Sequence, residues 1–196
     1  MKIAKIVSSN SHIDYVARVI DELDTASAPK VSDYGFGSFV SISSDEGEEA
    51  IGVVYNSIIV NPEYMNFGPR LSSAEELTVL SPDILNEQGI LLGILLLGSK
   101  SAGMPIQRVP ERVLFAGADV NTLNQTEFQE FHQNRNGGVS LHYYSQIISN
   151  IGNLGIPLLE NIINRLATVS NETDSNQLQV LRQNLRWQQT IGLMRQ

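Results

Sequence analysis

The sequence contains no cysteine. This absence excludes disulfide frameworks, thiolate metal sites and cysteine nucleophiles, and it is typical of proteins that stay in a reducing compartment. The N-terminal residues MKIAKIVSSNSH also lack the continuous apolar core of a signal peptide, because Lys5 and then polar residues interrupt them. We therefore expect a cytoplasmic protein.

Long apolar runs are missing as well. The most apolar stretch, residues 89–98, is about half as long as a membrane-spanning helix needs to be. The composition is otherwise that of a folded protein, with 42% hydrophobic and 17% charged residues. We expect a globular chain that does not span a membrane.

Positive charge is scarce. Lysine and arginine number 13 against 21 acidic residues, and the net charge of −8 repels a phosphate backbone. Direct binding to nucleic acid is therefore disfavoured. The exception is residues 175–196, which carry three arginines and no acid. Docking of this segment on an acidic surface, either its own or a neighbour's, explains the three arginines better than contact with nucleic acid does.

Two glycine-containing segments approach nucleotide-binding motifs without matching them. Residues 93–101, GILLLGSKS, differ from a P-loop because Ser99 separates the second glycine from Lys100, and because the four residues between the glycines are aliphatic. Residues 34–39, YGFGSF, have no third glycine and no helix after them. We interpret the first segment as a buried strand and the second as a turn whose glycines adopt positive φ.

The remaining polar clusters predict no catalytic residue, metal site or cofactor. Ser8, Ser9, Ser11, His12 and Asp14 lack the strand-turn-helix geometry of a nucleophile elbow, and His132 and His142 have no carboxylate at metal-ligand spacing. The acidic residues between the third and fourth strands are most simply a solvated hairpin tip, although they could meet a basic partner or a divalent ion. They are Asp45, Glu46, Glu48 and Glu49.

The first sixty residues predict short strands. Apolar residues alternate with polar or small ones around residues 3–7 and 13–19, and β-rich runs follow at residues 39–42 and 51–59. A polar segment containing Gly47 separates the last two runs, which predicts an antiparallel hairpin. Residues 89–97 then form a run that is apolar throughout, as expected for the innermost strand, buried on both faces.

Apart from residues 89–97, the sequence after residue 60 predicts mainly helices. Short helices are expected near Ser72 and Ser81, and an edge strand at residues 112–115. A helix through Phe128 and Phe131 should stop at residues 136–138. Two further helices should meet at a break between Gly155 and Pro157. We therefore expect an α+β fold, with a small closed antiparallel β-barrel at residues 1–120 and a helical region at residues 121–196.

The last predicted helix, which follows the polar residues 170–175, has two apolar stripes. Leu178, Leu181 and Leu185 lie on one face, where they can pack on the body of the protein. A second stripe and its neighbouring arginines are left for a partner. This candidate interface consists of Val180, Arg182, Arg186, Trp187, Ile191 and Met194.

Three segments of the barrel resemble a known family. They are IAKIVSSNSHIDYVARVID, then FVSIS after a glycine-containing turn, then EEAIGVVYNSIIVNP. Together they resemble the HAS-barrel, the small N-terminal barrel of HerA-type hexameric DNA translocases that rotary ATP synthase catalytic subunits share. Pro105, Pro110, Gly117 and Val120 are similar to that family's proline-containing connection toward its ATPase core.

The resemblance covers about 120 residues and ends where the family continues into a P-loop ATPase domain. Because this chain has helices there instead, ATP hydrolysis is not carried over. In the family the barrel forms a collar on a ring and offers a docking surface, which implies an assembly or adaptor role.

The leading hypothesis is a non-enzymatic interaction protein that forms a homo-oligomer or binds a protein partner such as a HerA-like ATPase. The alternative is a small-ligand-binding protein or enzyme that uses a pocket between barrel and helices. A deep pocket with converging polar groups would favour that alternative, whereas a filled barrel interior would not.

Overall fold

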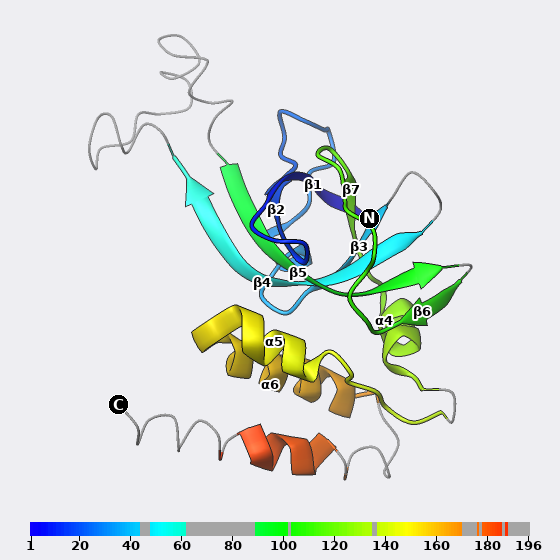
Figure 1. The fold of residues 1–196 in the computed structure, drawn as a ribbon. Coiled ribbons are helices and arrows are strands. Elements are labelled where there is room, and N and C mark those ends of the chain that lie inside the picture. The colour runs from blue at the N-terminus through cyan, green and yellow to red at the C-terminus, as the bar shows by residue number, and fades with distance from the viewer. Residues whose placement is uncertain are drawn as a thin grey trace.

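The structure is a computed structural model, and it shows a closed β-barrel followed by helices (Figure 1). This confirms the α+β fold expected from the sequence. The residues that it describes are 1–43, 48–61, 89–101, 103–134, 137–169, 176, 178–185 and 187. The predicted helices near Ser72 and Ser81 lie outside them.

Six antiparallel strands close the barrel in the order β2-β1-β7-β3-β4-β5, and the ring is completed by pairing between β5 and β2. A seventh strand, β6, pairs with the end of β5 outside the ring. The bounds are β1 Lys2–Ser9, β2 Asp14–Val19, β3 Phe39–Ser43, β4 Glu49–Val60, β5 Gly89–Ser101, β6 Met104–Ile106 and β7 Asp119–Thr122.

The barrel interior is filled by aliphatic side chains. Along most of the strands alternate residues point inward, as the two-residue period of the sequence predicts. On β1 both Ile3 and Ala4 are buried in this core, where the pairing with β7 has a register shift. Ile3, Ala17 and Val120 are fully buried there, as are Val40 and Leu96. The interior is a packed core.

Strand β5 is buried on both faces, as its continuous apolar sequence predicted. Leu92, Ile94 and Leu96 face the barrel interior, whereas Leu95 and Leu97 belong to a second core beneath the barrel. Lys100 pairs in antiparallel register with Glu49 on β4 and with Pro105 on β6. The P-loop-like segment is therefore strand, and it does not lead into a helix.

The hairpin between β3 and β4 is antiparallel, which confirms the predicted pairing. Residues 34–38 form the expected turn after a short 3-10 helix, η1 Val31–Asp33. Gly37 has a φ of +83°. This left-handed conformation favours glycine.

The predicted edge strand at residues 112–115 is wrong. These residues form an irregular connection, and strands occur on either side of it as β6 and β7. The apolar residues Val113, Leu114 and Phe115 suggested a strand, but only Leu114 is buried. Its backbone N–H donates to the Tyr15 hydroxyl at 3.1 Å, which replaces a strand-strand bond.

Strand β7 places the end of the barrel slightly later than residue 120. It runs to Thr122 and pairs with both β1 and β3. Asp119–Thr122 is a short strand of mostly polar residues, and its pattern was too weak to detect in the sequence.

The first helices after the barrel are α4 Gln125–His132, α5 Tyr144–Ile151 and α6 Gly155–Ala167. Asn124 caps α4 by accepting a hydrogen bond from the Glu127 backbone, while the Glu127 carboxylate accepts one in return. Helix α4 ends at His132, before the predicted stop at residues 136–138.

The expected break lies between α5 and α6, at a 3-10 turn, η2 Gly152–Leu154. Gly152, the first residue of this turn, interrupts the helix because its φ is +62°. Pro157 lies within the first turn of α6, where a missing N–H costs little. The break is therefore a few residues earlier than the sequence suggested, and Pro157 does not cause it.

The helices form layers on one side of the barrel. Helices α5 and α6 lie beneath it, and a last helix, which includes residues 178–185, lies beneath them (Figure 1). A second hydrophobic core joins these layers to the barrel wall. Its contributors include Phe39, Val53, Leu97, Ile147, Leu158, Ile162 and Leu185.

Candidate interaction surfaces

A buried aromatic cluster fixes the helices to the barrel. Phe39 of β3 contacts Phe128 edge-to-face, with ring centroids 5.0 Å apart, and it also contacts the ring of His132. Phe131 stacks on Tyr143 at 6.0 Å. Such contacts add to the free energy gained by burying the rings. The cluster therefore sets where α4 and the connection to α5 lie.

His132 is the polar centre of this cluster and is only 1% exposed. Its Nδ1 lies 2.7 Å from the Phe128 carbonyl, and its Nε2 lies 2.5 Å from the Tyr143 hydroxyl. Because a carbonyl can only accept, Nδ1 carries the proton and Nε2 accepts from the Tyr143 hydroxyl. Burial lowers the pKa of His132 to about 4, despite the hydrogen bond to Phe128. Nearby Arg165 lowers it further.

Both ring nitrogens of His132 are thus occupied by bonds within the protein. Burial also raises the pKa of Tyr143 well above its ordinary value. Neither side chain is free to exchange protons with a substrate in this arrangement. The histidine that looked unremarkable in the sequence is therefore a structural element of the joint between barrel and helices.

Gln107 forms a second link between the barrel and the helical region. Its side-chain amide donates to the carbonyls of Phe131 at 2.7 Å and of Ser140 at 2.9 Å. Its carbonyl accepts from the backbone of His142 at 2.8 Å. One side chain thereby connects the end of β6 to the segment between α4 and α5.

A cavity of about 710 Å³ lies at this boundary, between residues 105–107, the segment joining α4 to α5, and Leu181 of the last helix. Its size suits a small ligand. The Gln107 amide that lines it already has its hydrogen bonds, however, and the wall also includes the apolar Ile106 and Val139. The cavity is large enough for the ligand that the alternative hypothesis expects, but its Gln107 amide is already hydrogen-bonded within the protein.

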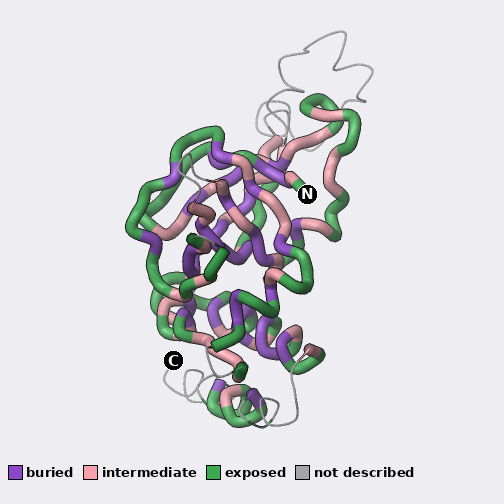
Figure 2. Tube along the Cα trace, turned by 90° about the vertical axis from the view of Figure 1, so that its right-hand side faces the viewer, coloured by how far each residue is buried: buried purple, intermediate pink, exposed green. Residues whose placement is uncertain are grey.

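The last helix has one buried and one exposed face. Leu178 and Leu185 are 2% and 0% exposed and belong to the core shared with α6, whereas Val180 and Trp187 are 58% and 68% exposed. Val180 and Trp187 are seven residues apart, which is two helical turns, so they lie on the same face. Figure 2 shows this helix at the periphery, with much of its surface exposed.

Of the other four members of the candidate interface, the structure describes one. Arg182 is exposed on the same helix. Arg186, Ile191 and Met194 lie outside the described residues. The structure thus brings Val180 and Trp187 together on one face and leaves the rest of the predicted stripe undescribed.

The sequence did not identify a second group of exposed apolar side chains, on β6 and the connection after it. It comprises Met104, Ile106, Val109, Val113 and Phe115. Strand β6 hydrogen-bonds only to β5, so its other edge is open among the described strands. The only sequence signal was the apolar stretch 113–115, which we had assigned to an edge strand.

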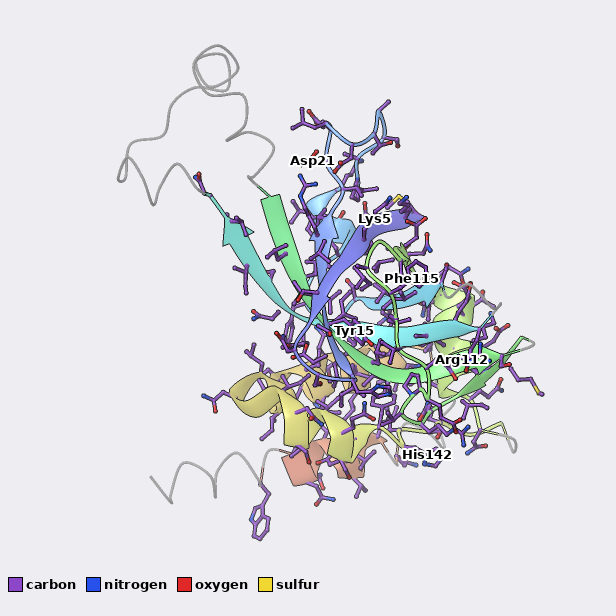
Figure 3. The ribbon with its side chains drawn as sticks, turned by 45° about the horizontal axis from the view of Figure 1, so that its top comes forward. Lys5, Tyr15, Asp21, Arg112, Phe115 and His142 are labelled. Carbon is purple, nitrogen blue, oxygen red and sulfur yellow. The ribbon has the colours of Figure 1, made fainter. Side chains whose placement is uncertain are left out.

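The polar residues considered for catalysis belong to separate parts of the fold. Residues 8–14 lie at the end of β1, the start of β2 and the turn between them. His12 in this turn is exposed, and its Nε2 lies 2.7 Å from the Pro110 carbonyl. His142 is exposed near the helical layer (Figure 3). Glu48 forms an ion pair with Arg112 at 3.4 Å, whereas Asp45 and Glu46 lie outside the described residues.

The described residues contain no group of three or more histidine or acidic residues that could hold a metal ion. In that part of the chain, no helix is long and apolar enough to cross a membrane.

No curated protein matches the sequence. A family match covers residues 1–195, so it includes the barrel and the helices together. The chain therefore belongs to the family described as Domain of unknown function (DUF8166).

Proposed function

We propose that this protein is a non-enzymatic assembly or adaptor protein that acts through the exposed face of its last helix. The proposal rests on the difference between the two faces of this helix, one buried and one exposed. Leu178 and Leu185 fix it to the body, while Val180 and Trp187 remain exposed on the other side. Tryptophan is enriched among residues that dominate the free energy of protein association.

The charge of the chain supports the choice of partner surface. Residues 175–196 carry arginines and no acid, in a protein whose net charge is −8. A second copy of the chain would therefore present both the apolar face and an acidic body for the arginines to meet. We propose a homo-oligomer formed through this helix.

The finer proposal is an accessory role beside a HerA-like ATPase. It rests on the resemblance of the barrel sequence and on the helices that follow the barrel where an ATPase domain would continue. In this role the exposed strand β6, with Met104 and Ile106, would provide a second docking surface.

The first test uses size-exclusion chromatography with light scattering. We expect the wild-type chain to be larger than a monomer, and Trp187→Ala to weaken association by about 2 kcal/mol, roughly thirtyfold in the dissociation constant. The matched control is Val31→Ala, which truncates an equally exposed apolar residue in η1. It should leave the oligomer unchanged.

Trp187 is the only tryptophan of the chain, so its fluorescence reports on this face directly. The emission should shift to shorter wavelength as protein concentration rises, because association removes the indole from water. A wild-type protein that stays monomeric at all concentrations, and that retains no HerA-like ATPase on an affinity column, would contradict the proposal.

A binding function is the second candidate, favoured by the cavity of about 710 Å³ beside Gln107. A ligand there should perturb His142 and Tyr144, which line the cavity, without changing the oligomeric state. Chemical-shift mapping against a small-molecule library separates this candidate from the first.

A further inference from the structure

A second cavity lies on the outer face of the barrel, on the side away from the helices. Its volume is about 610 Å³, within the usual range for small-molecule sites. It is lined by β1, by the end of β2 and by the loop that follows β2. Figure 3 shows Lys5 beside the loop that carries Asp21, on the side of the barrel opposite His142.

Positive charge is concentrated in this cavity. Lys2, Lys5 and Arg18 line it, and Asp24 is the one acidic residue among the described residues of its wall. Lys2 and Lys5 are two of only four lysines in a chain with a net charge of −8. The cavity therefore carries positive charge, whereas the molecule as a whole is negatively charged.

Lys5 and Arg18 are direct cross-strand partners on β1 and β2. Like charges placed opposite each other on a sheet repel and are destabilising. Arg18 is compensated by Asp21 at 3.2 Å and Asp24 at 3.5 Å. Lys2 is likewise paired, with Asp119 at 2.9 Å.

Lys5 differs from its neighbours, because no ion pair or side-chain hydrogen bond of its ammonium group is found among the described residues. It projects from β1 as an exposed residue between two inward-pointing neighbours, Ala4 and Ile6. Asp119 is the cross-strand partner of Lys5 on β7, but its carboxylate is paired with Lys2. An anion bound beside Lys5 would add a second negative charge next to this ammonium group, and it would relieve the repulsion from Arg18.

The loop over the cavity is held in place before any ligand binds. Asp21 accepts a hydrogen bond from the Leu23 backbone at 2.9 Å, and Asp24 accepts one from the Asp21 backbone at 3.1 Å. The same two carboxylates bind Arg18. Because the loop is organised by these bonds, a ligand would not have to order it, which reduces the entropic cost of binding.

The other lining groups indicate the class of ligand. Val7 and Ile20 supply an apolar wall, and Thr25 and Ser27 supply hydroxyl groups. We infer that this cavity binds a small organic anion, whose carboxylate or phosphate group lies between Lys5 and Lys2 and whose apolar part lies on Val7 and Ile20. The acidic residues already paired with Lys2 and Arg18 favour a ligand of low charge over a polyanion.

The test is an amide-detected NMR titration of the full chain with two probes, phenyl phosphate and benzoate. We expect saturable shifts confined to residues 2–7, 16–20 and 24–27 with at least one probe. The probe that binds more tightly identifies the group as phosphate or carboxylate. Raising the NaCl concentration from about 0.05 M to about 0.5 M should weaken the binding, because salt screens the attraction.

Three variants decide whether Lys5 is responsible. Lys5→Gln should weaken binding about tenfold, because it removes a charge-assisted hydrogen bond, whereas Lys5→Arg should retain most of the affinity. Lys30→Gln removes an exposed lysine outside the cavity and should have no effect. Lys5 is exposed, so these changes should preserve the fold, which the unperturbed part of each spectrum verifies.

The inference would be overturned by either of two results. One is the absence of saturable shifts in the wild-type spectrum with both probes. The other is binding that Lys5→Gln and Lys30→Gln weaken equally, which would show nonspecific attraction to positive charge.

Discussion

His132 shows how the environment of a single residue determines its role. In the sequence it is one of three histidines without a ligand pattern. In the structure it lies among Phe39, Phe128 and Phe131, with Arg165 stacked 4.0 Å from the Phe128 ring centroid. A positive charge on the imidazole would be buried beside that guanidinium, so the folded protein requires the neutral form.

This requirement predicts a pH dependence of stability. The pKa of His132 is about 4 in the folded protein and near 6.5 in an unfolded chain. Above pH 6.5 both states carry the neutral imidazole. As the pH falls from 6.5 toward 4, only the unfolded chain takes up the proton, so the free energy of unfolding should fall by about 3 kcal/mol.

Urea unfolding at several pH values between 4 and 7 measures this loss. Carboxylates titrate in the same range, so the informative quantity is the difference between the wild-type chain and His132→Gln. The variant should be less stable at pH 7 but should lose less stability on acidification. Equal losses in the two proteins would show that His132 does not contribute.

The elements differ in how well the sequence revealed them. The strands β1 to β5 were predictable because their apolar residues alternate or, in β5, run continuously. Strand β7 was not, since DVNT offers one apolar side chain and owes its conformation to pairing with β1 and β3. Helix α4 was predicted through Phe128 and Phe131, and the structure shows that it begins after the Asn124 cap, which is a purely local interaction.

The links between elements could not be predicted at all. Gln107 lies 33 residues from Ser140, and nothing in the local sequence distinguishes it from an exposed glutamine. The same is true of Gly98, where an added Cβ would lie 2.8 Å from a ring carbon of Phe131. Such contacts depend on the packing of segments distant in the chain.

A substitution of Gln107 tests the link that this side chain forms between the elements. Gln107→Ala would leave the carbonyls of Phe131 and Ser140 and the His142 N–H without this partner, and it should reduce the free energy of unfolding by about 2 kcal/mol. Gln133→Ala is the matched control, because Gln133 is an exposed glutamine in the same region. Thermal unfolding by circular dichroism compares the two, and similar melting temperatures would contradict the proposed link.

In the molecule as a whole, one part of the sheet contributes side chains to both hydrophobic cores. The wall formed by β4 and β5 buries Val54 and Ile94 inside the barrel, and Val53 and Leu95 against the helices. The side-chain amide of Gln146 in α5 also donates to the Leu96 carbonyl of β5. Barrel and helices are therefore joined by a common wall of buried side chains.

This sharing predicts cooperative opening. Amide hydrogens at the centres of β5 and α6 should exchange with similar free energies of opening, because neither core can be exposed without disturbing the common wall. Hydrogen exchange measured by mass spectrometry under native conditions tests this. Much faster exchange in α6 than in β5 would show that the helices unfold independently.

The pairing at the far end of β4 and β5 has an evolutionary implication. Val60 is the direct partner of Gly89, so the chain departs from the barrel and returns to it at adjacent positions. We expect insertions or deletions between these two residues to leave the pairing of β4 with β5 unaltered. Members of the family can therefore diverge in length there while keeping the same core.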